Sequence, residues 1–197
     1  MDNIKKVKAL SIWIFIVPFV ATNTCLILIT QFHNLFPNPE NIIHNTFPYI
    51  DGGASISRTA RYFPTYLVFK PAMFLTAYLL VKYWIYNKQI ILNIHGDHKH
   101  LKKMLFFGIG SAICLVIHSI FLGIKFDIDA YKLFRRVIML AFIIFEIAAQ
   151  TYFVLIFYSI KSKLKSFINE TYLKCKAVLV SILIFMIICS LFSEFLS

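Results

Sequence analysis

Long apolar blocks alternate with polar connections along the whole chain. There are five such blocks, at residues 9–31, 63–86, 104–124, 136–160 and 177–195. A helix rises 1.5 Å per residue, so about 20 apolar residues cross a hydrocarbon core about 30 Å thick. Helices buried in soluble proteins usually have shorter apolar runs, of about 10–14 residues. The pattern therefore predicts one all-α domain over residues 1–197, an integral membrane bundle of about five transmembrane helices.

The first connection, at residues 32–62, is much longer than the others. Connections of this length are usually functional or folded against the elements that they join. The run Asp51-Gly52-Gly53 predicts a turn, because glycine adopts a positive φ without steric cost. We therefore expect a long outward loop lying on the membrane surface, above the ends of the helices.

Composition and charge support a membrane protein. The chain is 59% hydrophobic and only 15% charged, with a mean hydropathy of +0.76, whereas soluble domains are about 25% charged. The net charge is +11, but the basic residues lie mostly at the ends of the apolar blocks. No basic run with interleaved aromatic residues, of the kind that grips a nucleic-acid strand, is present. We therefore expect no nucleic-acid partner.

The distribution of lysine and arginine predicts the orientation. Thirteen of these residues lie on the side of the N-terminus and six on the opposite side. Because cytosolic segments carry the excess of positive charge, the N-terminus is predicted to be cytosolic. The 32–62 loop and the C-terminus then face outward. The membrane would be the plasma (inner) membrane of a bacterium or an endomembrane of a eukaryote.

A few ionisable and polar residues lie inside the apolar blocks. Each ionisable group costs about 2.5–3.5 kcal/mol on insertion scales, so such groups are candidates for a functional site. Lys70 and His118 each lie about seven residues, or about 10 Å, from the outward ends of their helices. Glu146 lies near the midplane, and Gln150 follows on the same helix face. We predict that these four residues line one intramembrane polar pocket.

Four arginines lie where the mouth of this pocket would open, namely Arg58, Arg61, Arg135 and Arg136. Arginine binds phosphate through two parallel hydrogen bonds, so the four are predicted to hold a lipid headgroup. An alternative is that Glu146 pairs with Lys70 or His118 only to fix the packing of the helices. A further alternative is a proton relay through the same residues.

Catalytic, metal and redox motifs are not found. The four cysteines have neither C-x-x-C nor metal-ligand spacing. His95, His98 and His100 belong to a short loop among lysines, which favours a solvated loop over a metal site. No G-x-S-x-G or H-E-x-x-H motif occurs. We therefore expect no metal and no cofactor, and nothing in the sequence specifies an enzyme.

The first outward loop reads Pro48-Tyr49-Ile50-Asp51-Gly52-Gly53-Ala54-Ser55, and the block that follows ends in Val81-Lys82-Tyr83-Trp84. This segment resembles the first loop and second helix of the DRAM/FRAG/SFK membrane proteins, which include autophagy modulators and GPI-lipid-remodelling proteins. Asp51 stands where that family has a serine, and the family usually has six spans. The resemblance implies a multi-pass membrane protein that acts in lipid handling.

The predicted function is to bind, or help remodel, a membrane lipid through an outward-facing polar pocket. One alternative is a non-catalytic assembly or structural subunit, whose partners are other membrane proteins. Gly108, Gly110 and Ser111 would then let a neighbouring helix approach closely. Another is a small proton-coupled transporter that uses Glu146 and His118, although no inverted repeat is found.

Overall fold

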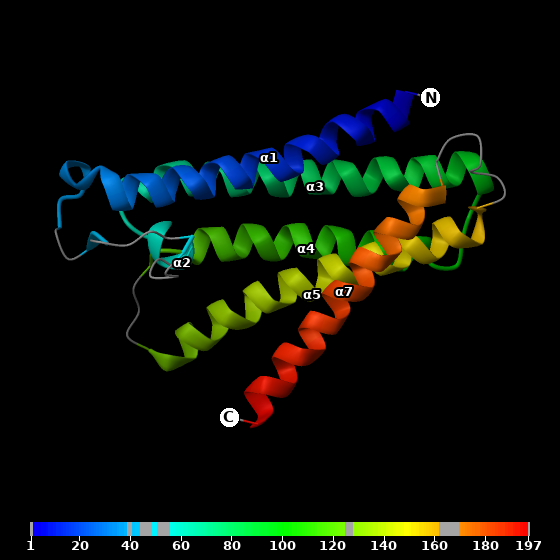
Figure 1. Ribbon diagram of the computed structural model, residues 1–197. Coiled ribbons are helices and arrows are strands. Elements are labelled where there is room, and N and C mark those ends of the chain that lie inside the picture. Colours follow the sequence, from blue (N-terminus) through cyan, green and yellow to red (C-terminus); the bar gives the residue numbers. More distant parts are fainter. Residues whose placement is uncertain are drawn as a thin grey trace.

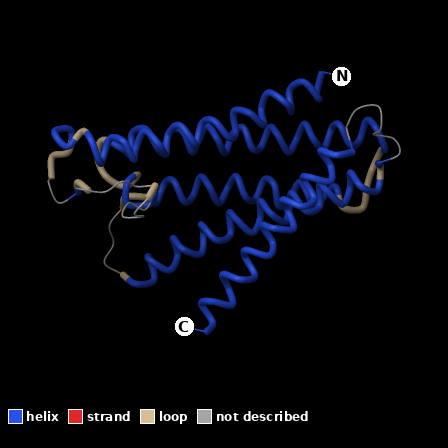
Figure 2. The backbone as a smooth tube through the Cα atoms, in the orientation of Figure 1, coloured by secondary structure: helices blue, strands red, loops and turns tan. Residues whose placement is uncertain are grey.

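The computed structural model describes residues 2–38, 41–43, 49–50, 56–124, 128–161 and 170–196. Within these ranges the chain forms helices and no strand (Figure 2). The long helices are α1 (Asp2–Gln31), α3 (Thr65–His95), α4 (Leu101–Phe121), α5 (Asp129–Ser159) and α7 (Glu170–Leu196). A short 3-10 helix, η1 (His33–Leu35), and a single turn of helix, α2 (Ile56–Thr59), lie between α1 and α3. All five long helices are long and apolar enough to cross a membrane, which confirms the predicted helical membrane bundle.

The helices extend beyond the apolar blocks that predicted them. α3 continues from Tyr86 to His95, and α5 begins at Asp129 rather than at residue 136. Apolar residues mark the part of a helix that lies in hydrocarbon, whereas backbone hydrogen bonding continues into the polar interface. α3 stops at Gly96, whose φ of +83° is suited to glycine and whose N–H donates to Leu92 O at 2.9 Å.

Successive long helices pack side by side and alternate in direction. α1 packs on α3, α3 on α4, α4 on α5, and α5 on α7, which crosses the bundle at a wide angle (Figure 1). α2, the turn before α3 and the start of α5 lie at one end, on the left in Figure 1. These segments carry Arg58, Arg61, Arg135 and Arg136, so we call this end the arginine end. The chain N-terminus, the α3–α4 connection and the start of α7 lie at the opposite end, which we call the lysine end.

Glycines on α4 allow the close packing of the central helices. An ideal Cβ on Gly108 would lie 2.4 Å from Cγ of Trp84, which is fully buried. A Cβ on Gly110 would lie 2.7 Å from Cδ2 of Phe145. The predicted small-residue face is therefore used twice, because Gly108 accommodates α3 and Gly110 accommodates α5. This packing fixes α4 between the helices that carry the candidate site.

Candidate functional site

A cavity of about 590 Å³ opens at the arginine end, and we call it the mouth. Its polar lining consists of Arg61, His118, Lys132, Arg135 and Arg136. Its apolar lining consists of Met139, Leu140 and Ile143, which follow the arginines along α5. The mouth is therefore a basic opening whose deeper wall is apolar.

Three nitrogens around the mouth are buried and have no hydrogen-bond partner within the described ranges. They are Arg61 Nε, Arg135 Nε and His118 Nδ1. Most buried polar atoms in proteins are hydrogen-bonded, and leaving one without a partner costs about 1–3 kcal/mol. Arg135 also experiences the like charge of Arg61. The arrangement is costly for the protein alone, and an anion between these groups would offset the cost.

Asp129, an acidic residue at the start of α5, is already paired with a lysine. Asp129 accepts a hydrogen bond from Lys132 Nζ at 2.9 Å, three residues along the same helix. Arg135 lies beside the ring of Tyr131, with 6.0 Å between its guanidinium carbon and the ring centroid. Asp127, two residues earlier in the chain, lies outside the described residues.

Local contacts between α4, α5 and the α2–α3 turn hold the mouth together. Tyr131 on α5 donates its hydroxyl hydrogen to Phe121 O at the end of α4, at 2.7 Å. Gly123 has a φ of +91°, and an ideal Cβ there would lie 2.8 Å from Arg61 O. Only a glycine allows both this backbone conformation and this close approach. Arg61 is thereby brought next to the start of α5.

A second cavity, of about 410 Å³, lies deeper in the bundle, and we call it the chamber. Residues from α1, α3, α4 and α5 line it: Ile14, Pro18, Thr22, Phe69, Met73, Thr76, Leu80, Leu115, His118, Met139, Phe142 and Glu146. Most of this lining is apolar. His118 and Met139 line both cavities, so the chamber adjoins the mouth.

Glu146 is held by neighbours on two helices. Gln150 Nε2 donates to one carboxylate oxygen of Glu146, and Ser111 Oγ donates to the other, each at 2.8 Å. Ser111 also lies 2.9 Å from Gly108 O, so its single hydroxyl hydrogen is shared between two acceptors. Gln150 therefore contacts Glu146 along α5, and Ser111 is a further partner that connects α4 to α5.

Lys70 takes a different position from the one expected. Its Nζ donates to Ile120 O at 3.2 Å and lies 5.7 Å from the centroid of the Tyr66 ring. Lys70 is not among the residues that line the mouth or the chamber, and within the described ranges Glu146 forms no ion pair with it. The flexible stem of a lysine lets its ammonium group reach polar atoms at the helix end.

The structure divides the predicted site residues into three groups. Arg61, Arg135, Arg136 and His118 lie together at the mouth, and His118 and Glu146 line the chamber. Gln150 supports the chamber from outside. Arg58, on α2, is exposed and does not line the mouth, and Lys70 lies apart from both cavities.

Lys176 is a half-buried cation that the sequence interpretation does not single out. It is on α7, where its Nζ lies 4.0 Å from the centroid of the Phe153 ring and 3.5 Å from Tyr83 Oη. Glu146 contributes an electrostatic interaction from further away. The last apolar block begins at residue 177 and leaves Lys176 just outside it, but α7 begins at Glu170 and brings this side chain against the bundle.

The histidines at the lysine end stabilise the α3–α4 connection. His98 Nδ1 accepts the backbone N–H of His100 at 3.2 Å, and its Nε2 lies 2.9 Å from Ser159 Oγ at the end of α5. Burial, together with the nearby His100, lowers the pKa of His98. Within the described ranges no group of three or more potential ligands could hold a metal ion, so these contacts indicate a structural role.

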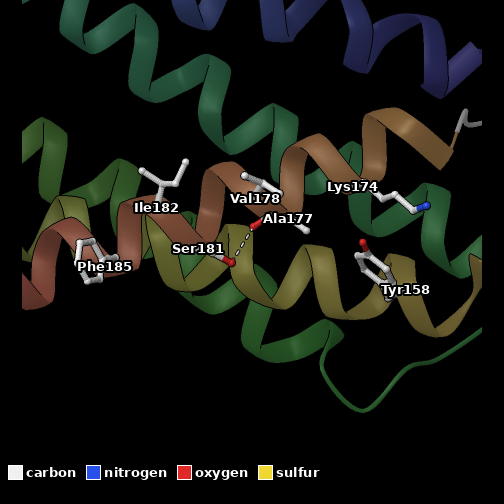
Figure 3. Close-up of a pocket in the computed structure, with 7 residues that line it drawn as sticks. All are labelled: Tyr158, Lys174, Ala177, Val178, Ser181, Ile182 and Phe185. Atoms are coloured by element: carbon white, nitrogen blue, oxygen red, sulfur yellow. Dashed lines mark hydrogen bonds between the residues drawn. The ribbon is translucent and has the colours of Figure 1, made fainter.

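A third cavity lies between α5 and α7 and measures about 570 Å³. Figure 3 shows Tyr158 and Lys174 at one end of this cavity and Phe185 at the other. Lys174 is already paired with Glu170 at 3.3 Å. The remaining lining is mainly apolar, as expected for a groove that faces lipid, so we do not assign a functional site here.

Comparison with known protein families, with curated proteins and with solved structures found no match for this chain. The resemblance of residues 47–84 to the DRAM/FRAG/SFK family therefore stays a prediction. Most of its loop motif, including residues 51–55, lies outside the described ranges. Function is inferred below from the mouth and the chamber.

Proposed function

We propose that this multi-pass membrane protein binds an anionic membrane lipid, with the headgroup in the mouth and an acyl chain in the chamber. The observation that carries the proposal is that the mouth and the chamber share two lining residues. A basic opening with buried, unsatisfied nitrogens adjoins an apolar space through His118 and Met139. An amphiphile with an anionic head has the matching distribution of charge and apolar surface.

The depth of the chamber fits the proposed ligand. Glu146 lies eleven positions after Arg135 on α5, which corresponds to about 16 Å along the helix axis. This distance is about half the thickness of a hydrocarbon core. A lipid with its headgroup at Arg135 would therefore extend its chain through one leaflet, toward Glu146. The arrangement supports binding of a lipid from the leaflet at the arginine end.

The orientation of the protein in the membrane is part of the same proposal. The excess of lysine at the lysine end favours a cytosolic N-terminus, which places the mouth at the outer or lumenal leaflet. Lipid binding also agrees with the lipid-handling role that the resemblance of residues 47–84 implies. The alternatives of an assembly subunit and a proton-coupled transporter do not account for the unsatisfied nitrogens at the mouth.

Native mass spectrometry of the detergent-purified protein tests the proposal. The wild-type protein is expected to retain a phosphate-containing lipid, and Arg135→Gln is expected to lose it. Arg135→Gln removes a charge that is repelled by Arg61, so the variant should remain folded. Arg58→Gln is the matched control, because it makes the same chemical change at the same end of the bundle but outside the mouth.

Two results would contradict lipid binding at this site. One is equal retention of the lipid by wild-type protein and Arg135→Gln. The other is equal loss in Arg135→Gln and Arg58→Gln, which would indicate a general attraction to the basic surface. Melting temperatures of all three proteins, measured in the same detergent, show whether any loss of lipid reflects unfolding.

A further inference from the structure

We infer that the mouth selects a doubly charged phosphate headgroup, a phosphomonoester, over the singly charged phosphodiester of common phospholipids. This inference rests on the proposed function and specifies its ligand class. It follows from the charge at the mouth and from the separate elements that supply its basic residues.

The charge at the mouth exceeds that of one phosphodiester. Arg61, Arg135 and Arg136 line it together with Lys132, and Lys132 is paired with Asp129. Three arginine charges therefore remain without an acidic partner among the described lining residues. A phosphodiester brings a single negative charge, whereas a phosphomonoester brings about −1.5 to −2 near neutral pH. The second charge is the better match for guanidinium groups that repel one another.

The donors also approach from separate elements. Arg61 belongs to the α2–α3 turn, His118 to the last turn of α4, and Arg135 to the start of α5. Each of the three residues lines the mouth and has one buried nitrogen without a hydrogen-bond partner within the described ranges. A phosphomonoester has three terminal oxygens that accept hydrogen bonds, so it can meet basic groups that come from three elements. A phosphodiester has only two, because its other two oxygens carry carbon substituents.

The lining below the donors indicates how the phosphate is attached. Met139, Leu140 and Ile143 form the deeper wall of the mouth, and Met139 continues into the chamber. Free phosphate would satisfy the nitrogens but would leave this apolar wall and the chamber unused. An alkyl chain on the phosphate ester would fill both. The shared chemistry is the dianionic phosphate group, and the experiment must separate lipid from free ion.

Phosphatidic acid and phosphatidylmethanol with identical acyl chains make the sharpest pair of probes. They differ by one methyl group on the phosphate, which removes one charge and one terminal oxygen. Binding to the purified full-length protein is measured by titration in native mass spectrometry, with inorganic phosphate as a third probe. Phosphatidic acid is expected to bind about tenfold more tightly, because one additional charge-assisted hydrogen bond is worth about that factor.

Substitution by lysine separates hydrogen-bond geometry from charge. Arg135→Lys keeps the positive charge but removes Nε and the planar guanidinium. It is expected to reduce the preference for phosphatidic acid to less than about threefold while both lipids still bind, as estimated from the modest net value of one hydrogen bond. Arg58→Lys, outside the mouth, is expected to keep the wild-type preference.

The outcomes distinguish this inference from the proposed function. Equal binding of the two lipids, abolished by Arg135→Gln, would refute the phosphomonoester preference and leave lipid binding intact. Binding of neither lipid would refute both. Displacement of phosphatidic acid by an equal concentration of inorganic phosphate would show that the mouth binds the free ion, and this too would refute both.

Discussion

The packing of α4 on α3 gives a prediction whose size can be worked out from the structure. Replacing Gly108 by alanine would place a Cβ 2.4 Å from Cγ of Trp84 and 2.5 Å from its Cδ1 and Cδ2. Carbon atoms pack without repulsion at about 3.5–4.0 Å, so the helices or the indole must move by more than about 1 Å. Gly108→Ala is therefore expected to lower the stability of the bundle.

The indole of Trp84 has little freedom to move away. It is fully buried, and its ring packs edge-on against Tyr83 and Phe153, with centroid distances of 5.1 and 6.2 Å. Inserting a carbon into a well-packed core costs about 1–3 kcal/mol. For a chain of this size, each kcal/mol lowers the melting temperature by about 2–4 °C. The expected decrease for Gly108→Ala is therefore roughly 2–12 °C.

Gly110→Ala is the matched control, because it is the same change on the same helix. Its Cβ would meet Cδ2 and Cε2 of Phe145, at 2.7 and 2.9 Å. Phe145 is only partly buried, so its ring can swing outward and the decrease should be smaller. Thermal unfolding in detergent, followed by tryptophan fluorescence in a Trp13→Phe background, reports on Trp84 alone. A melting temperature for Gly108→Ala equal to or above that of Gly110→Ala would refute this reasoning.

Two further substitutions test the mouth and the half-buried Lys176. Gly123→Ala alters no side chain that would contact the ligand, but its Cβ would lie 2.8 Å from Arg61 O and displace Arg61. It is therefore expected to weaken lipid retention several-fold. Unchanged retention in native mass spectrometry would contradict this. Lys176→Met is expected to leave the melting temperature unchanged or raise it, because even partial removal of an ammonium group from water costs free energy, and a cation–π contact at a partly exposed site returns only about 0.5–2 kcal/mol. A clear decrease for Lys176→Met would show that its distant attraction to Glu146 matters more.

The sequence predicts how far along its helix each polar residue lies, because the rise of a helix is fixed. Counting from the ends of the apolar blocks places His118 near the arginines and Glu146 further in. Both residues line the chamber in the structure. Depth does not predict which side of a helix a residue occupies or where a long side chain ends. This is why Lys70 was expected in the pocket and is found against Ile120 O instead.

Hydrophobicity alone also does not predict the residues at which each helix begins and ends. Polar residues at the membrane interface keep helical hydrogen bonds, so α7 begins at Glu170, seven residues before the apolar block does. That extension carries Lys176 against Phe153 and Tyr83. Lys176, which lies just before the last apolar block, is therefore half-buried and in contact with two aromatic side chains. The packing of α7 against its neighbours shows these contacts, and the hydrophobic pattern does not.

The mouth depends on short connections more than on the long helices. Gly123 and the hydrogen bond from Tyr131 to Phe121 O bring the α2–α3 turn and the start of α5 together. These contacts join residues from different connections, and the periodic pattern of a helix does not predict such contacts. The sequence therefore places the arginines at one end of the bundle but does not predict which of them line the mouth. The Nε of an arginine is also nearer to the backbone than an ammonium group and moves less freely. Once the connections fix the backbone at Arg61 and Arg135, both Nε atoms remain beside the mouth, whereas Lys70 can reach elsewhere.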